Sequence, residues 1–137
     1  MANIGTSSLA IDSLVRDALA RCSNVSLAII FGSLAAGRPR ADSDLDIAVG
    51  ADKPISMPER IAIIQTLAEV TGRPIDLIDL AAVTEPLLGQ ILKHGRRVLG
   101  SDTSYGKLIS RHLIDQADFM PLIDRMLAER RMAWIGK

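Results

Sequence analysis

Hydrophobic residues recur every three or four positions in two parts of the chain, which is the period of an amphipathic helix. The first predicted helix begins at Ser7 or Ser8, and its apolar positions are Ile11, Leu14, Val15, Ala18, Leu19 and Cys22. The second is the clearest in the sequence, because Ser56-Met-Pro-Glu59 has the form of a capping box and Gly72 and Pro74 follow its end. Its expected apolar positions are Ile61, Ile64, Leu67 and Ala68.

Short runs of branched apolar residues lie between and after these helices. They predict buried strands over residues 26–31, 43–49 and 75–80, and a short edge strand over residues 97–99. A third helix is expected to open at Thr84-Glu85-Pro86 and to end at Gly95. The order of elements therefore predicts strands and helices that alternate within one folding unit.

The residues from Ser104 onward have helical character. Because a proline inside a helix causes a break, Pro121 predicts two helices here, with Asp118 at the start of the second. An apolar stripe in this last helix indicates either core packing or contact with a partner helix; its members are Leu122, Ile123, Met126, Leu127 and Trp134.

The composition of the 137-residue chain narrows the class of protein. Hydrophobic residues make up 48% and aromatic residues only 3%, which indicates one domain with an aliphatic core and no stacking surface for single-stranded nucleic acid. Sixteen Lys and Arg residues balance sixteen Asp and Glu residues, so charge favours neither direct nucleic-acid binding nor a membrane surface. The single cysteine, together with the lack of a signal-peptide pattern or membrane-spanning run, predicts a cytoplasmic protein.

Two aspartates interrupt the predicted strand over residues 43–49. Asp44 and Asp46 are two positions apart and so point to the same side of a strand, although aspartate is depleted in strands. Carboxylates placed in this way can bind a hard cation that also accepts substrate phosphates, and Mg²⁺ is the expected ion. The alternative is an exposed edge strand whose charges prevent aggregation.

A third carboxylate is expected from the strand over residues 75–80. Asp76 and Asp79 are three positions apart and face opposite sides, so only one of them can join the first pair. We favour Asp76, which is nearer the start of the strand, over a reading in which it is merely solvated. Three such carboxylates can hold two metal ions for phosphoryl or nucleotidyl transfer.

Gly32 and Ser33 follow the first predicted strand, ten residues before Asp44. A glycine at a strand end lets the backbone approach a phosphate, and a serine adds a hydroxyl donor. An ordinary turn is the alternative explanation. For Arg38 and Arg40 we expect either contact with phosphates or a solvated loop.

These residues together resemble a known family. Gly-Ser, ten residues and then Asp-x-Asp is the signature of the minimal nucleotidyltransferases in the DNA polymerase beta-like superfamily, and the resemblance covers roughly residues 25–100. Within it, residues 75–80 and 90–100 look like the corresponding segments of the MntA antitoxins, which partner HEPN toxins. The resemblance implies an α/β (α+β) fold with a small mixed sheet flanked by helices, in one domain of residues 1–137 with a helical extension at 104–137.

The resemblance also implies an activity, namely transfer of AMP from ATP to a tyrosine of the cognate HEPN ribonuclease toxin. The implied catalytic and metal residues are Asp44, Asp46 and Asp76, and the implied nucleotide-binding residues are Gly32, Ser33 and Ser43. Two alternatives stay open at this point. The acceptor is a small molecule, as in aminoglycoside nucleotidyltransferases, or the protein is an antitoxin that inhibits by binding without catalysis.

Overall fold

The computed structural model describes residues 8–22, 24–32 and 43–135, and its centre is a four-stranded sheet. The strands lie in the order β3-β2-β1-β4; their bounds are β1 Val25–Phe31, β2 Leu45–Ala51, β3 Ile75–Asp79 and β4 Arg96–Leu99. The β1 strand pairs antiparallel with both β2 and β4, whereas β2 and β3 are parallel. The sheet is therefore mixed, as predicted.

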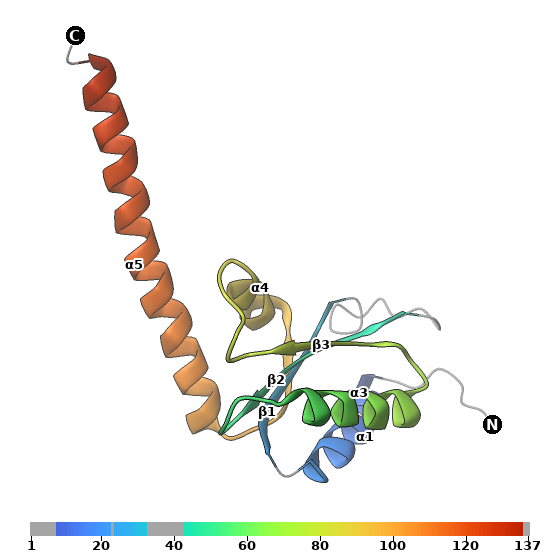
Figure 1. Cartoon of the computed structure of the whole chain (residues 1–137). Helices are drawn as coiled ribbons and strands as arrows, with labels where there is room; N and C mark the ends of the chain where they lie inside the picture. The colour runs from blue at the N-terminus through green and yellow to red at the C-terminus, as the bar shows by residue number, and fades with distance from the viewer. Residues whose placement is uncertain (1–7, 23, 33–42, 136–137) are drawn as a thin grey trace.

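Helices cover both faces of this sheet (Figure 1). The helices α1, Ser8–Ala20, and α3, Met57–Thr71, pack on one face, where the side chains of Leu45 and Ile47 are buried. The other face is covered by α4, Leu87–His94, and by the first part of α5, Asp102–Ile135. Because side chains alternate along a strand, Asp46 and Ala48 point toward the α4 face.

The predicted start and end of α3 are confirmed. The Ser56 hydroxyl accepts a hydrogen bond from the Glu59 amide, the Glu59 carboxylate accepts one from the Ser56 amide, and Gly72 ends the helix in the left-handed conformation with φ of 67°. The predicted apolar face was partly wrong. Ile61 is 48% exposed and Ile63 is buried instead, because α3 packs against α1 and the sheet together.

The helix after Ser101 differs from the expected pair of helices. α5 runs without a break from Asp102 to Ile135, so the predicted helix start at Asp118 was wrong. An interior proline such as Pro121 removes one backbone hydrogen bond, and the other turns on either side still form. Most of α5 extends away from the sheet (Figure 1). No helix in the described ranges is both long and apolar enough to span a membrane.

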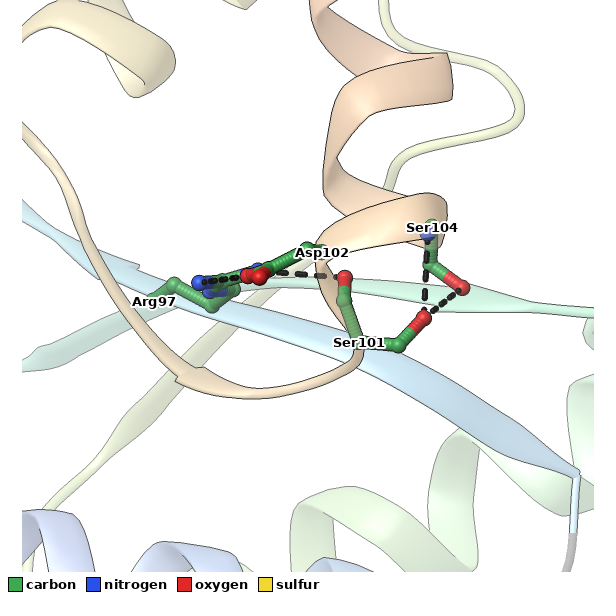
Figure 2. Close-up of polar contacts among 4 residues, drawn as sticks. All are labelled: Arg97, Ser101, Asp102 and Ser104. Atoms are coloured by element: carbon green, nitrogen blue, oxygen red, sulfur yellow. Dashed lines mark hydrogen bonds and ion pairs between the residues drawn. The ribbon is translucent and has the colours of Figure 1, made fainter.

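The start of α5 is anchored to strand β4 by polar contacts, which Figure 2 shows. The Ser101 hydroxyl accepts a hydrogen bond from the Ser104 amide and so caps the first turn. Arg97 donates one hydrogen bond to the Ser101 carbonyl at 3.1 Å and another to the Asp102 carboxylate at 2.8 Å, and its guanidinium lies over the Tyr105 ring. These contacts determine where α5 leaves the sheet.

A half-buried ion pair joins α1 to β4 at the other side of the sheet. Asp12 is 6% exposed, and its two carboxylate oxygens accept hydrogen bonds from Nε and Nη2 of Arg96 at 2.8 and 2.9 Å. Such a bidentate pair gives directional as well as electrostatic stabilisation.

Replacing Asp12 with Ala should lower the free energy of unfolding by about 2 kcal/mol, because Arg96 then loses its carboxylate partner in a half-buried position. Asp17 lies on the same helix, is exposed, and provides a control: Asp17→Ala should change stability by less than about 0.5 kcal/mol. Urea unfolding of the three proteins measures the difference. Equal stability of the two variants would contradict a stabilising role for the ion pair.

Candidate metal and nucleotide site

Two of the predicted carboxylates lie side by side at one end of the sheet. Asp46 in β2 is the register partner of Asp76 in the parallel strand β3, so both side chains point to the α4 face from adjacent strands. Asp46 is also paired with Phe31, the last residue of β1. The three strand ends meet around the Asp46 side chain, which is half-buried, while Asp76 is exposed.

The pKa of the Asp46 carboxyl is raised above its ordinary value. The largest cause is burial, which disfavours the charged form; the negative charge of Asp76, a hydrogen bond shared with Asp76 and the more distant charge of Asp44 act in the same direction. The Asp46 carboxyl therefore retains its proton more readily than an isolated aspartate does.

Gly32 leaves the space that the Asp46 side chain occupies. A Cβ atom at position 32 would lie 2.0 Å from Oδ2 of Asp46, and the backbone there is left-handed with φ of 73°. Both observations require glycine. The sequence signal of a glycine at the end of β1 thus has a physical cause beyond phosphate approach, namely close packing against a carboxylate.

Asp44 lies at the rim of this pair and is exposed. The β2 strand begins at Leu45, two residues later than predicted, so Asp44 precedes the paired part of the strand. Across the described ranges, no three His, Cys, Asp or Glu side chains converge closely enough to hold one metal ion. A site formed by Asp44, Asp46 and Asp76 together stays a prediction.

The other predicted binding residues are placed as follows. Ser33, Arg38 and Arg40 lie outside the described residues. Ser43 is half-buried, and its backbone carbonyl accepts a hydrogen bond from Nη1 of Arg73 at 3.0 Å. A nucleotide-binding role for Ser43 is a prediction that this contact leaves open.

The rival carboxylate Asp79 has a local role at the opposite end of β3. Its register partner is Val49, three pairs along the ladder from Asp46 and Asp76. Its Oδ1 atom accepts a hydrogen bond from the Ala81 amide at 2.9 Å, which forms the turn that ends the strand.

Two polar features near the site had no clear signal in the sequence. Arg73 joins the starts of β2 and β3 through the Ser43 carbonyl. Because these two residues are 30 positions apart, no local sequence pattern predicts the contact. His112 pairs with Glu85 at 2.8 Å between α5 and the start of α4, and its side chain is 19% exposed. Gly89 faces this pair, since a Cβ there would lie 2.9 Å from Cε1 of His112.

The chemistry of the carboxylate pair fits a divalent cation. Asp46 and Asp76 offer hard oxygen donors from adjacent strands, and the proximity that raises the pKa of Asp46 would become favourable with a positive charge between them. The Gly32 backbone lies against the same carboxylate, so a phosphate bound at this strand end would also be close to the cation.

Comparison with known proteins gives results consistent with this geometry. Residues 15–104 match the profile of the family described as "Polymerase beta, Nucleotidyltransferase". The protein adenylyltransferase MntA of Shewanella oneidensis is 30% identical over 119 residues, which is 84% of each chain.

Two solved structures share the fold. One, described as a toxin-antitoxin with AMP-PNP, has a TM-score of 0.67 and 26% identity and covers 85% of this chain and 98% of its own. The other is a tri-AMPylated HEPN toxin of Shewanella oneidensis in complex with an MNT antitoxin; its matching chain has a TM-score of 0.64 and 24% identity and covers 88% of this chain and 98% of its own.

Replacing Asp46 with Asn should raise the melting temperature of the metal-free protein at pH 7 by a few degrees, because the neutral amide removes the cost of burying a charge and the repulsion with Asp76. A raised carboxyl pKa destabilises the folded state only where the group is ionised, so this gain should shrink as pH falls through the pKa of Asp46. Thermal unfolding in EDTA at a series of pH values between about 4 and 7 measures the gain in melting temperature. The exposed Asp52→Asn is the control, and a larger gain at low pH would refute the prediction.

Gly32→Ala and Gly72→Ala form a matched pair, because both glycines have positive φ but only Gly32 contacts Asp46. Gly72→Ala should destabilise the fold by about 1 kcal/mol through the left-handed backbone alone. Gly32→Ala should cost at least about 1 kcal/mol more, since the Asp46 carboxylate must also move. Urea unfolding compares the two, and an equal loss would show that Asp46 does not occupy this space in solution.

Proposed function

The chain belongs to the polymerase beta nucleotidyltransferase family, and on this premise we propose that it is an antitoxin that transfers AMP from ATP to a tyrosine of a cognate HEPN ribonuclease toxin. The observation that carries the proposal is the pairing of Asp46 with Asp76 beside Gly32 at one end of the sheet. The 30% identity to a protein adenylyltransferase over most of both chains supports the choice of AMP and of a protein acceptor.

In the proposed reaction, Asp44, Asp46 and Asp76 would hold Mg²⁺. The bound ion supplies charge neutralisation of the phosphates and lowers the pKa of a coordinated hydroxyl. Such help is needed because a tyrosine hydroxyl has an ordinary pKa near about 10.

The residues of the chain then orient the reactants. Gly32 lets the triphosphate approach the strand end, and Asp76, the exposed member of the pair, accepts the proton of the attacking hydroxyl. The hydroxyl oxygen forms a bond to the α-phosphorus, the bond from that phosphorus to the bridging oxygen breaks, and pyrophosphate leaves.

Helix α5 supports a protein acceptor over a small molecule. It projects beyond the sheet (Figure 1), and Leu113, Ile114 and Leu127 on it are 56%, 60% and 52% exposed. Leu127 was predicted to lie in the core or against a partner helix, and its exposure favours the partner. The described part of the chain has no second group of strands and helices that would enclose a small acceptor. Apolar side chains exposed on one projecting helix are typical of a protein contact.

The cytoplasm is the compartment that we propose for this reaction. Cys22 is the chain's one cysteine, so it forms no disulfide within the chain, and burial raises the pKa of its thiol; both fit a reducing compartment. ATP and Mg²⁺ are also available there.

Incubation with ATP, Mg²⁺ and a co-encoded HEPN protein should increase the mass of that protein by about 329 Da for each AMP transferred. Intact-mass spectrometry measures the increase, and peptide mapping should place it on a tyrosine. A panel of aminoglycosides and other small hydroxyl compounds serves as the competing acceptor. Transfer of AMP to a small compound and not to the HEPN protein would contradict a protein acceptor.

The double variant Asp44→Ala, Asp46→Ala separates catalysis from inhibition by binding. It should lose at least about a thousandfold in AMP transfer, because removal of the cation's ligands removes the charge stabilisation of the phosphates. It should also fail to neutralise the toxin in cells at equal abundance. Full neutralisation by the double variant would show that the antitoxin acts by occlusion.

A further inference from the structure

The backbone on either side of Asp44 is held by Arg73 and Pro74, which form the corner between α3 and β3. Before it, the Ser43 carbonyl accepts a hydrogen bond from Nη1 of Arg73 at 3.0 Å. After it, the Leu45 amide donates to the Pro74 carbonyl at 2.8 Å. Arg73 and Pro74, the two residues just before β3, therefore hold the backbone on both sides of Asp44, the carboxylate that precedes the paired part of β2.

This corner is built by the end of α3. Gly72 turns the chain through its left-handed conformation, and Arg73 and Pro74 then lead directly into β3, which carries Asp76. A displacement of the corner would thus move the Asp44 backbone relative to Asp76. Arginine suits this bridge because its long side chain reaches across to the neighbouring strand while its planar group donates in a defined direction.

We propose that Arg73 is a positioning residue that holds Asp44 beside Asp46 and Asp76, so that the three carboxylates can converge on one divalent cation. The inference rests on the proposed function. Arg73 acts through the Ser43 carbonyl, which belongs to the residue directly before Asp44. Residues that orient metal ligands in this way typically change metal affinity by about 10–100-fold when replaced.

The chain offers a matched control at the opposite side of the sheet. Arg16 on α1 donates from Nε to the Val98 carbonyl of β4 at 2.9 Å, so like Arg73 it joins two distant segments through one backbone carbonyl. Arg16→Gln removes a contact of the same kind without touching the β2–β3 corner. Any general effect of losing such a bond should be shared by Arg16→Gln and Arg73→Gln.

The first measurement is amide hydrogen exchange of the metal-free proteins. Arg73→Gln should speed exchange of the Leu45 amide by about tenfold or more, because the bond to Pro74 opens more often once the corner is loosened. Arg16→Gln should leave that amide as in the wild type. Unchanged Leu45 exchange in Arg73→Gln would overturn the inference.

The second measurement is calorimetric titration with MnCl₂ in the presence of a non-hydrolysable ATP analogue. Arg73→Gln should weaken Mn²⁺ binding by about tenfold, while Arg16→Gln binds as the wild type does. Arg73→Lys retains a cationic donor and should recover most of the affinity, and it also serves if the glutamine variant fails to fold. Equal Mn²⁺ affinity in all variants would overturn the inference and leave the proposed function intact.

A wild-type protein that binds no Mn²⁺ and transfers no AMP would instead contradict the proposed function. Leu45 exchange needs neither metal nor nucleotide, so it still decides whether Arg73 holds the backbone at Asp44. The two failures are therefore distinguishable.

Discussion

The repulsion between Asp46 and Asp76 is the constraint around which this fold is arranged. Parallel pairing of β2 with β3 puts the two carboxylates in register, and burial of Asp46 makes their charges costly. The apolar side chains of β2 alternate between the two core clusters, and Asp46 takes a position that faces α4. A cation at this end of the sheet would favour the charged form of the carboxylates.

Several features keep the pair in place despite that repulsion. Gly32 supplies the space beside Asp46, and β3 is held to its neighbours from two directions. Arg60 of α3 donates to the Leu77 carbonyl, and Arg73 donates to the Ser43 carbonyl at the start of β2. Both arginines donate to backbone carbonyls and so restrain the strands that carry the two carboxylates.

The long helix α5 relates the site to the proposed acceptor. It starts at the contacts of Arg97 with Ser101 and Asp102, and further along it is joined to the start of α4 by the His112–Glu85 pair. Helix α4 packs on the sheet face that carries the carboxylates, and the rest of α5 extends outward on that side (Figure 1). A protein bound along α5 would therefore lie over the same face of the sheet as Asp46 and Asp76, although α5 begins at the opposite end of the strands.

The sequence by itself determined the elements whose signals are local. The capping box at Ser56 and the left-handed Gly72 depend on neighbours within a few residues, and these predicted one helix and its end. The spacing of Asp44 and Asp46 predicted a shared strand face, but only Asp46 lies within β2. Local rules misjudged α5 at Pro121, because whether an interior proline ends a helix depends on the packing around it.

Only the tertiary structure decided which distant groups meet. The register of β2 and β3 brings Asp76 to Asp46, the end of α3 brings Arg73 to Ser43, and the contact of α5 with the start of α4 brings His112 to Glu85. Each contact joins residues at least 27 positions apart, and no periodicity in the chain encodes such a pairing. The residue types that carry the chemistry were legible in the sequence, whereas their distances follow from how the sheet and helices pack.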